Sequence, residues 1–330
     1  MKKRIFIAGG AGFIGYYITK ELLEKGHNVF IYDNFSNYIP NKESFYNFYL
    51  QKRLKDIKDQ VEIIRGDVLD KKFLTKILRN TKPDIVINLV AIPLATASNY
   101  FFEDAMQINL NGHINLLEAI RYSNSVQRFV YASSSFVYGH FQYDPADENH
   151  PTSPIDIYGG TKLSCEILSR TYSQRYNIEH AIIRPSAVYG PTDVNRRVSQ
   201  VFIENALTRK PLALFGGGKD KVDFTYVTDA AHGFVLAALM PEAKNEIFNI
   251  TAGQGRSTEE FAKILDKLIP GGIKTEIKPI DQERPIRGSL DITKARKILN
   301  YKPEYQLEDG LKEYINYIIS TNLFEKFLKR

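Results

Sequence analysis

The sequence predicts a doubly wound parallel α/β sheet with a smaller α/β lobe interleaved into its second half. Over residues 1–183, short runs rich in apolar and β-branched side chains alternate with helical patterns, which is typical of βαβ units. A glycine-rich turn joins the first of these runs to the first helical pattern. With 330 residues, the chain is long for one core and sufficient for a sheet domain and a second lobe.

The strands and helices of the sheet domain follow from their residue patterns. The expected strands are Arg4–Ala8, Asn28–Tyr32, Val61–Arg65, Ile85–Leu89, Phe129–Ala132 and His180–Ile183. The expected helices are Phe13–Lys25, Lys71–Arg79, Asp104–Arg121 and Tyr158–Tyr176. The connection from Asn34 to Gln60 is long, and its aromatic stretch Phe45–Tyr49 predicts an inserted helix that packs on the protein or, as a second reading, lines a ligand site.

The second half of the chain has shorter elements and more turns, among them Gly216–Gly218. Phe224–Val227 followed by Asp229–Leu239 predicts a strand and a helix that rejoin the sheet. We therefore expect the sheet domain to comprise residues 1–183 with 224–250, and the smaller lobe to comprise 184–223 and 251–330.

Composition excludes several classes of protein. Hydrophobic residues make up 43% of the chain and charged residues 25%, as in soluble globular proteins. No apolar stretch approaches the ~20 residues of a membrane span, and the N-terminus leads into a strand rather than a signal helix. The net charge of +6 is scattered. Its densest run, Lys52–Lys58, predicts a solvated helix face rather than a nucleic-acid site. The single Cys165 excludes an internal disulfide and fits a reducing cytoplasm.

The glycine turn has the pattern of a dinucleotide site. Gly9, Gly12 and Gly15 form G-x-x-G-x-x-G directly between the first strand and the first helix. Such a turn lets the backbone approach a pyrophosphate, toward which the N–H groups of the helix then point. Strand before and helix after make the pattern specific. We expect the backbone of Phe13 and Ile14 to take part.

An acidic residue ends the second strand. Asp33 is placed to accept hydrogen bonds from the adenosine ribose and to repel a 2′-phosphate, which predicts NAD rather than NADP. Its neighbour Asn34 is expected at the same site. Asp67 and Val68, after the third strand, either hold the adenine edge or form a loop without such a role.

Tyr158 and Lys162 lie one helical turn apart and therefore on one face of their helix. The serine run Ser133–Ser135 ends a predicted parallel strand, where open α/β sheets bind ligands. A free tyrosine has a pKa near ~10. Lys162 and a bound nicotinamide cation would favour the phenolate, so Tyr158 could deprotonate an alcohol while a serine hydroxyl holds the reacting oxygen. Alone, the pair would more simply be a solvent-facing Tyr and Lys.

These residues resemble the extended short-chain dehydrogenase/reductases that modify nucleotide sugars, such as UDP-glucose 4-epimerase. The resemblance covers nearly the whole chain. Its markers are the glycine turn, Asp33, Gly66–Val68, Asn109–Gly112, Ser133–Gly139, Tyr158 with Lys162, Arg184–Pro191, Asp223–Asp229 and Asp291–Ala295. The resemblance implies a Rossmann fold, bound NAD, a nucleotide-diphosphate sugar substrate and a homodimer formed by the helices Asp104–Arg121 and Tyr158–Tyr176.

The resemblance also assigns residues. Counting back from Val137-Tyr138-Gly139, Ser134 matches the catalytic Ser/Thr of the family, beside Tyr158 and Lys162. Family members that dehydrate the sugar carry Asp-Glu after that position, whereas this chain has Ser135 and Phe136. The expected cofactor site comprises Gly9, Gly12, Phe13, Ile14, Gly15, Asp33, Asn34, Asp67, Val68, Ala91, Asn109, Tyr158 and Lys162. The expected substrate site comprises Ser134, Ser135, Ala187, Arg284 and Arg287, and no metal is expected.

The substrate side departs from the family pattern. Ala187 replaces a common Asn, Val222 a common Arg, and Asn88 an expected His. Arg284 and Arg287 suit a diphosphate, although surface arginines in a loop are an equal alternative.

The predicted function is a nucleotide-sugar 4-epimerase that oxidises C4 and reduces it again on NAD. The alternatives are a 4-dehydrogenase or 4-ketoreductase, then a 4,6-dehydratase, and, outside enzymes, an NAD-binding sensor or scaffold.

Overall fold

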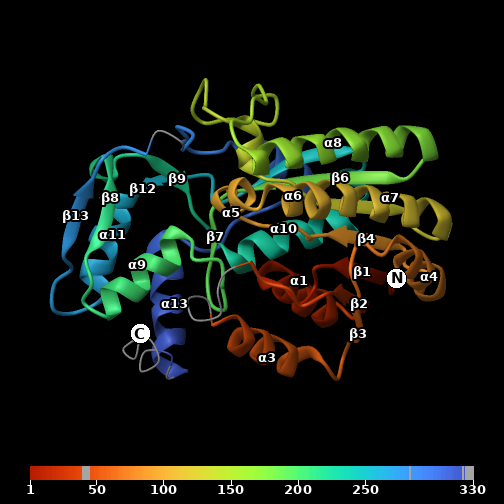
Figure 1. Ribbon diagram of the computed structural model, residues 1–330, viewed down its shortest axis with the longest axis horizontal. Helices are drawn as coiled ribbons and strands as arrows, with labels where there is room; N and C mark the ends of the chain where they lie inside the picture. Colours follow the sequence, from red (N-terminus) through yellow and green to blue (C-terminus); the bar gives the residue numbers. More distant parts are fainter. Residues whose placement is uncertain (39–44, 282–283, 322, 324–330) are drawn as a thin grey trace.

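A seven-stranded parallel sheet forms the centre of the molecule (Figure 1), whose computed structural model describes residues 1–38, 45–281, 284–321 and 323. Its strand order is β11-β6-β5-β4-β1-β2-β3. The strands are β1 (Arg4–Ala8), β2 (Asn28–Asp33), β3 (Glu62–Arg65), β4 (Ile85–Asn88), β5 (Arg128–Ala132), β6 (Glu179–Pro185) and β11 (Glu246–Ile250). The order reverses between β1 and β4, which confirms the predicted doubly wound fold class.

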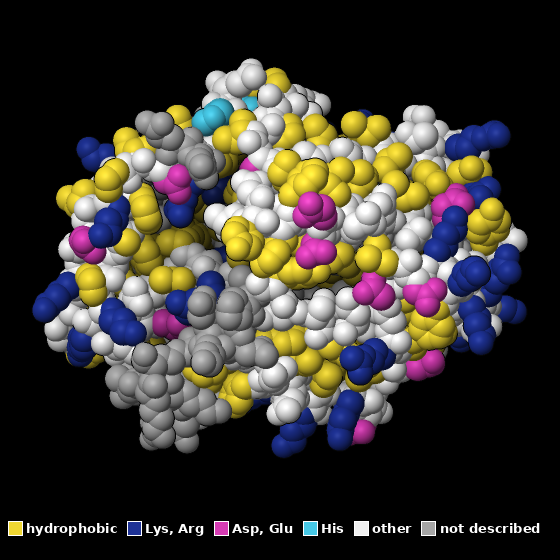
Figure 2. Space-filling model, in the orientation of Figure 1, with side chains coloured by type: hydrophobic (Ala, Val, Ile, Leu, Met, Phe, Trp, Pro, Cys, Tyr) yellow, Lys and Arg dark blue, Asp and Glu magenta, His cyan; other side chains and the backbone are white. Residues whose placement is uncertain are grey.

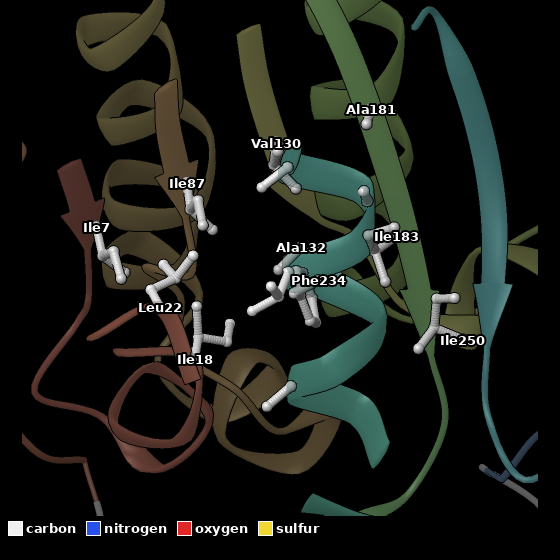
Figure 3. Close-up of a cluster of buried hydrophobic side chains, with 14 of the residues drawn as sticks. Ile7, Ile18, Leu22, Ile87, Val130, Ala132, Ala181, Ile183, Phe234 and Ile250 are labelled. Carbon is white, nitrogen blue, oxygen red and sulfur yellow. The ribbon is translucent and has the colours of Figure 1, made fainter. Parts of the chain in front are cut away.

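Helices cover both faces of this sheet because its strands are apolar on both sides. The helices of the sheet are α1 (Phe13–Glu24), α4 (Lys71–Thr81), α7 (Gly112–Ser123), α8 (Ile157–Tyr176) and α10 (Val227–Leu239). In β1, Ile5 and Ile7 face a core shared with α1 and α10, whereas Phe6 and Ala8 face one shared with α4, α7 and α8. Figure 3 shows the first of these cores, with Ile18, Leu22 and Phe234 packed beneath the strands.

The predicted helix Asp104–Arg121 is divided in the structure. Its residues fall in three consecutive elements: α6 (Phe102–Ala105), a π-helical turn η1 (Met106–Asn111) and α7. The short helix α5 (Ala95–Tyr100) precedes them. A π turn within an α-helix often marks a functional position, and this one contains Asn109.

The smaller lobe is built from short elements around its own core. They are β8 (Leu212–Phe215), β9 (Lys221–Asp223), β12 (Gly255–Ser257), β13 (Thr275–Lys278), α9 (Val198–Leu207), α11 (Thr258–Leu268) and α13 (Leu307–Ser320), with α12 (Thr293–Leu299) beside β11. The inserted helix is longer than predicted: α3 (Tyr46–Ile57) contributes the rings of Tyr46 and Tyr49 to this second core.

The prediction that Phe224–Val227 rejoins the sheet is wrong. Thr225 and Tyr226 form β10, which pairs with β7 (Val188–Tyr189) outside the seven-stranded sheet. The strand that joins the sheet is β11, which follows α10 and pairs with β6. The sequence pattern indicates no strand at Glu246–Ile250, because a short run that contains Glu246 and Asn249 has little apolar periodicity.

Asp223 ties three segments of the second half together from a fully buried position. Its carboxylate accepts hydrogen bonds from the Thr251 hydroxyl (3.0 Å) and the Leu290 amide (3.1 Å). Burial raises the pKa of Asp223 from 3.8 to about 7, because desolvation outweighs these hydrogen bonds.

This shift predicts a loss of stability with rising pH. A carboxyl group whose pKa is higher in the folded state contributes stability below pH 3.8, and that contribution is lost as the pH rises through about 7. Asp223→Asn cannot ionise, so we expect its free energy of unfolding, relative to the natural protein, to increase from pH 4 to pH 8. Urea unfolding over this range measures the difference. A constant difference would contradict the prediction.

Candidate active site

The glycine turn between β1 and α1 leaves no room for side chains. Gly9 has a φ of +81°, and a Cβ on Gly15 would lie 2.6 Å from the Gly9 carbonyl oxygen. Gly12 is the N-cap of α1 and supplies no side-chain cap, so the N–H groups of the first turn stay open to an anion. This cradle fits the pyrophosphate of a dinucleotide.

The predicted adenosine-side residues meet at the carboxyl ends of β2 and β3. One carboxylate oxygen of Asp33 accepts from the Ala11 amide (3.1 Å) and the other from the Phe35 amide (2.8 Å). Asn34 donates to Asp67 (2.9 Å), and Val68 is buried next to it. Asp33 therefore contacts the glycine turn directly, at the place where a ribose would lie.

Asn109 uses both ends of its buried amide within the protein. Its oxygen accepts from the Ile92 amide (2.8 Å), and its nitrogen donates to the Thr161 hydroxyl (3.2 Å). It thereby holds the loop after β4, which includes Ala91, against α8. We therefore expect Asn109 to influence cofactor binding by fixing the position of this loop.

Ser134, Tyr158 and Lys162 come together where β5 ends and α8 begins. The Ser134 oxygen accepts from the Phe136 amide (3.2 Å), and its hydroxyl is close enough to Tyr158 to lower the pKa of the phenol. Lys162 donates to the Ala132 carbonyl (2.7 Å), and its ammonium lies 5.6 Å from the centre of the Tyr158 ring. The structure thus joins the three residues predicted to be catalytic.

Burial dominates the electrostatics of these groups. It raises the pKa of Tyr158, whereas the charge of Arg197 and the hydrogen bond from Ser134 lower it. Burial also lowers the pKa of Lys162 to about 8. Desolvation therefore brings the titration of the amine closer to neutral pH and moves that of the phenol farther from it.

The neighbouring histidine is not a candidate base. Burial lowers the pKa of His113 to about 3, and its ring nitrogens contact Asn88 (3.2 Å) and Ser169 (3.1 Å). Asn88, which stands where the family has His, is thus part of a structural contact.

Of the residues predicted to bind the substrate, Arg287 lies near Tyr158 through Phe136, whereas Arg284 lies on the surface. Phe136 meets the Tyr158 ring edge-on (5.7 Å), and the Arg287 guanidinium lies 4.5 Å from the centre of the Phe136 ring. Ser135 is buried, and its hydroxyl has no partner among the described residues. Arg284 is exposed and pairs with Asp281 (2.8 Å).

Ala187 follows β6 in a strained conformation with a φ of 35°. Such a backbone is rare for a residue with a side chain and is often found at functional sites.

The sequence did not indicate the role of Arg53. We expected it on a solvated face, and this is wrong: its side chain is 1% exposed. Arg53 donates to the carbonyls of Ala11 (3.0 Å) and Thr192 (2.8 Å), so it joins the glycine turn to the segment before α9. Because Thr192 is distant in sequence, spacing gave no signal of this contact.

Cys165 is fully buried and donates to the Asn109 carbonyl (3.2 Å), so it belongs to the core. Within the described ranges, no three His, Cys, Asp or Glu side chains gather as they would around a metal ion. None of the helices in these ranges is long and apolar enough to cross a membrane.

Fold and site together define a dinucleotide-binding enzyme with a Ser-Tyr-Lys centre. The NAD dependent epimerase/dehydratase family matches residues 5–251, and the chain belongs to this family. It is therefore an NAD-dependent epimerase or oxidoreductase, as predicted, and NAD is the cofactor of its family.

Relatives match over nearly their whole length. The chain is 34% identical to a putative UDP-glucose 4-epimerase of Methanocaldococcus jannaschii, covering 96% of this chain and 99% of the relative. It is 30% identical to a UDP-glucuronate 4-epimerase of Thermodesulfobacterium geofontis, covering 94% of each. The crystal structure of a UDP-glucuronic acid 4-epimerase from Bacillus cereus, in complex with UDP-glucuronic acid and NAD, matches with a TM-score of 0.88 at 29% identity, covering 96% and 99% of the two chains.

Proposed function

We propose that this protein is a nucleotide-sugar 4-epimerase that oxidises C4 of the sugar transiently and reduces it again. The observation that carries the proposal is that Ser134, Tyr158 and Lys162 gather where β5 ends, with Lys162 bonded to Ala132 and its ammonium 5.6 Å from the Tyr158 ring centre, while Ser135 and Phe136 follow the serine. A phenylalanine cannot transfer a proton, so the centre is suited to oxidation and reduction at one carbon rather than to loss of water.

The residues divide the chemistry among them. Ser134 holds the C4 oxygen, and Tyr158 takes its proton as the C4–H and O–H bonds break and the C4=O bond forms. Lys162 stabilises the phenolate. NAD, when bound, supplies the hydride acceptor. Once the ketone has turned its other face, the same hydride would return to C4 on that face while Tyr158 returns the proton to the C4 oxygen, which inverts C4 and leaves NAD as it began.

We propose that the two ligand sites follow the domain division that the sequence predicts. The cofactor would occupy the domain of residues 1–183 with 224–250, contacting the glycine turn, Asp33 and the Asn34–Asp67 pair. The nucleotide sugar would lie against the lobe of 184–223 and 251–330. Figure 2 shows the surface hollowed between these two parts. Burial lowers the pKa of the Arg287 guanidinium to about 10, and a desolvated cation of this kind favours a diphosphate.

A net 4-dehydrogenase or 4-ketoreductase is the second candidate, because the same three residues would serve it without rotation of the ketone. A 4,6-dehydratase ranks below it, since Ser135 and Phe136 lack the acid and base. A non-catalytic NAD-binding sensor would not need the intact Tyr158–Lys162 pair.

The deciding experiment incubates the purified protein, without added cofactor, with UDP-, GDP-, CDP- and dTDP-sugars. We expect NMR to show a C4-inverted sugar at equilibrium and no net absorbance of NADH. Stoichiometric NADH with a 4-keto product that stops after one turnover would reject the epimerase in favour of the dehydrogenase.

We also propose a homodimer formed through α7 and α8. Tyr100, Phe102 and Ile167 are 82%, 47% and 49% exposed. Figure 2 shows hydrophobic side chains gathered on this face, over α5, α6 and α8. An exposed patch of large apolar residues is typical of an interface. The cytoplasmic location stays a prediction.

Replacing Ile167 tests this interface. We expect Ile167→Glu to weaken dimerisation by about 100-fold, because the symmetric interface would bury two new charges. Analytical ultracentrifugation measures the change. Ile319→Glu, on α13 and 56% exposed in the natural protein, is the matched control and should leave assembly unchanged. A monomeric natural protein would contradict the proposal.

A further inference from the structure

A buried ion pair lies next to the serine run Ser133–Ser135. Arg184, on β6, donates to both oxygens of Glu166, at 2.9 Å and 2.7 Å. The two side chains are 4% and 1% exposed. Arg184 also donates to the Tyr138 hydroxyl (3.0 Å) and the Glu148 carbonyl (3.2 Å), so its guanidinium is fixed on several sides.

Glu166 reaches from this pair to the serine run. The Ser133 hydroxyl donates to one of its oxygens at 2.5 Å, and the Ser133 amide donates to the Ile183 carbonyl at 2.8 Å. The residue next to Ser134 is thus held by both its side chain and its backbone. A short bond to a carboxylate is among the stronger hydrogen bonds of proteins.

Three residues of α8 follow one another at intervals of four. Tyr158, Lys162 and Glu166 therefore lie on one face of the helix. Lys162 bonds the carbonyl of Ala132 while Glu166 bonds the hydroxyl of Ser133. Two turns of α8 are therefore fastened to two consecutive residues at the end of β5.

We propose that Glu166, held by Arg184, is a positioning residue that keeps Tyr158 of α8 in register with Ser134 and presents a negative charge to Lys162. This inference rests on the catalytic roles assigned above to Ser134, Tyr158 and Lys162.

The surroundings of Lys162 identify Glu166 as the source of that charge. From α8, the neighbouring groups are Tyr158, Cys165 and Glu166; from β5 comes Tyr131, whose ring centre lies 5.1 Å from the ammonium, and from α7 comes His113. Burial raises the pKa of Cys165 to about 11 and raises that of Tyr131, so both are neutral at pH 7. His113 is neutral as well. Glu166 opposes the burial that lowers the pKa of Lys162 to about 8.

The test compares Glu166→Gln with Glu166→Gln/Arg184→Met. The single variant leaves Arg184 unpaired and is expected to melt at a lower temperature, whereas the double variant removes both charges and should regain stability. In Glu166→Gln only the negative charge is lost and the charge of Arg184 remains, whereas the double variant loses both charges. We therefore expect the Lys162 titration midpoint, followed by NMR in protein labelled with [ε-¹³C]lysine and assigned with Lys162→Met, to fall by about half a pH unit or more in Glu166→Gln and by less in the double variant.

A kinetic readout accompanies the titration. With the nucleotide sugar that the natural protein turns over, kcat should fall by about 10- to 100-fold and its alkaline limb should move to lower pH, while KM changes little. Glu179→Gln is the control, because it breaks the ion pair with Arg128 (2.7 Å) at the start of β6. It should alter neither Lys162 nor kcat.

An unchanged Lys162 midpoint in folded Glu166→Gln would overturn the inference. The same holds for a kcat that falls only in proportion to the folded fraction. If the natural protein turns over none of the sugars, the proposed function fails, whereas the NMR titration still decides whether Glu166 acts on Lys162.

Discussion

Tyr158→Phe is expected to lower kcat by about 10³-fold or more, within the range that general acid–base groups contribute, while NAD and the nucleotide sugar still bind. The phenol is the group that meets Ser134, and no other described acid or base is placed to replace it: His113 is bonded to Asn88 and Ser169, and Lys162 donates to the Ala132 carbonyl. Phenylalanine keeps the ring that packs edge-on against Phe136. The loss should therefore appear in kcat rather than in KM.

Steady-state kinetics and the NAD content of the purified variant measure this outcome. Tyr172→Phe is the matched control, because Tyr172 lies on the same helix and donates to Glu118 (2.9 Å), away from the centre. It should retain activity. A Tyr158→Phe variant with more than about a tenth of the natural kcat would mean that another group moves the proton.

For Tyr158 to act as a base, neighbouring positive charge must offset the effect of burial on its pKa. Desolvation holds the pKa of Tyr158 above its ordinary value of 10, even though the charge of Arg197 lowers it. Burial shifts the pKa of Lys162 in the opposite direction, down to about 8. An ammonium that gives up its proton near pH 8 loses its stabilising charge there, which predicts a decline of kcat on the alkaline side.

Local patterns predicted the sheet and the cofactor turn, because each is a property of neighbouring residues. The glycines, the apolar run of β1 and the four-residue spacing of Tyr158 and Lys162 all lie within short windows. The contact between Ser134 and Tyr158 could be expected as well, since parallel strands end at one edge of the sheet.

Contacts between distant segments could not be read from such windows. Arg53 has the composition of a solvated helix, yet it is buried because the chain near Thr192 returns over the glycine turn. Glu166 and Arg184 are separated by 18 residues and belong to different elements. Likewise, β10 and β11 are both short, and their different partners, β7 and β6, lie far from them in the sequence.

Gly15→Ala is expected to lower the affinity for NAD by about 100-fold or more, because the pyrophosphate must approach the backbone closely at this turn. The added Cβ would lie 2.6 Å from the Gly9 carbonyl oxygen and 2.8 Å from the Gly10 Cα. These are backbone atoms, so the turn itself must move. Since Arg53 and Asp33 both contact Ala11 within this turn, the displacement would also disturb the proposed ribose site.

Nucleotide released from the purified protein and calorimetric titration with NAD measure the effect. Gly160→Ala is the control, because a Cβ there meets nothing within 4 Å. Alanine in place of a helical glycine should raise stability by about 1 kcal/mol and leave NAD bound. A Gly15→Ala protein that purifies with a full complement of NAD would show that the cofactor does not depend on this close approach. The turn would then contribute through its fold alone, and the affinity would have to come from Asp33 and the loop held by Asn109.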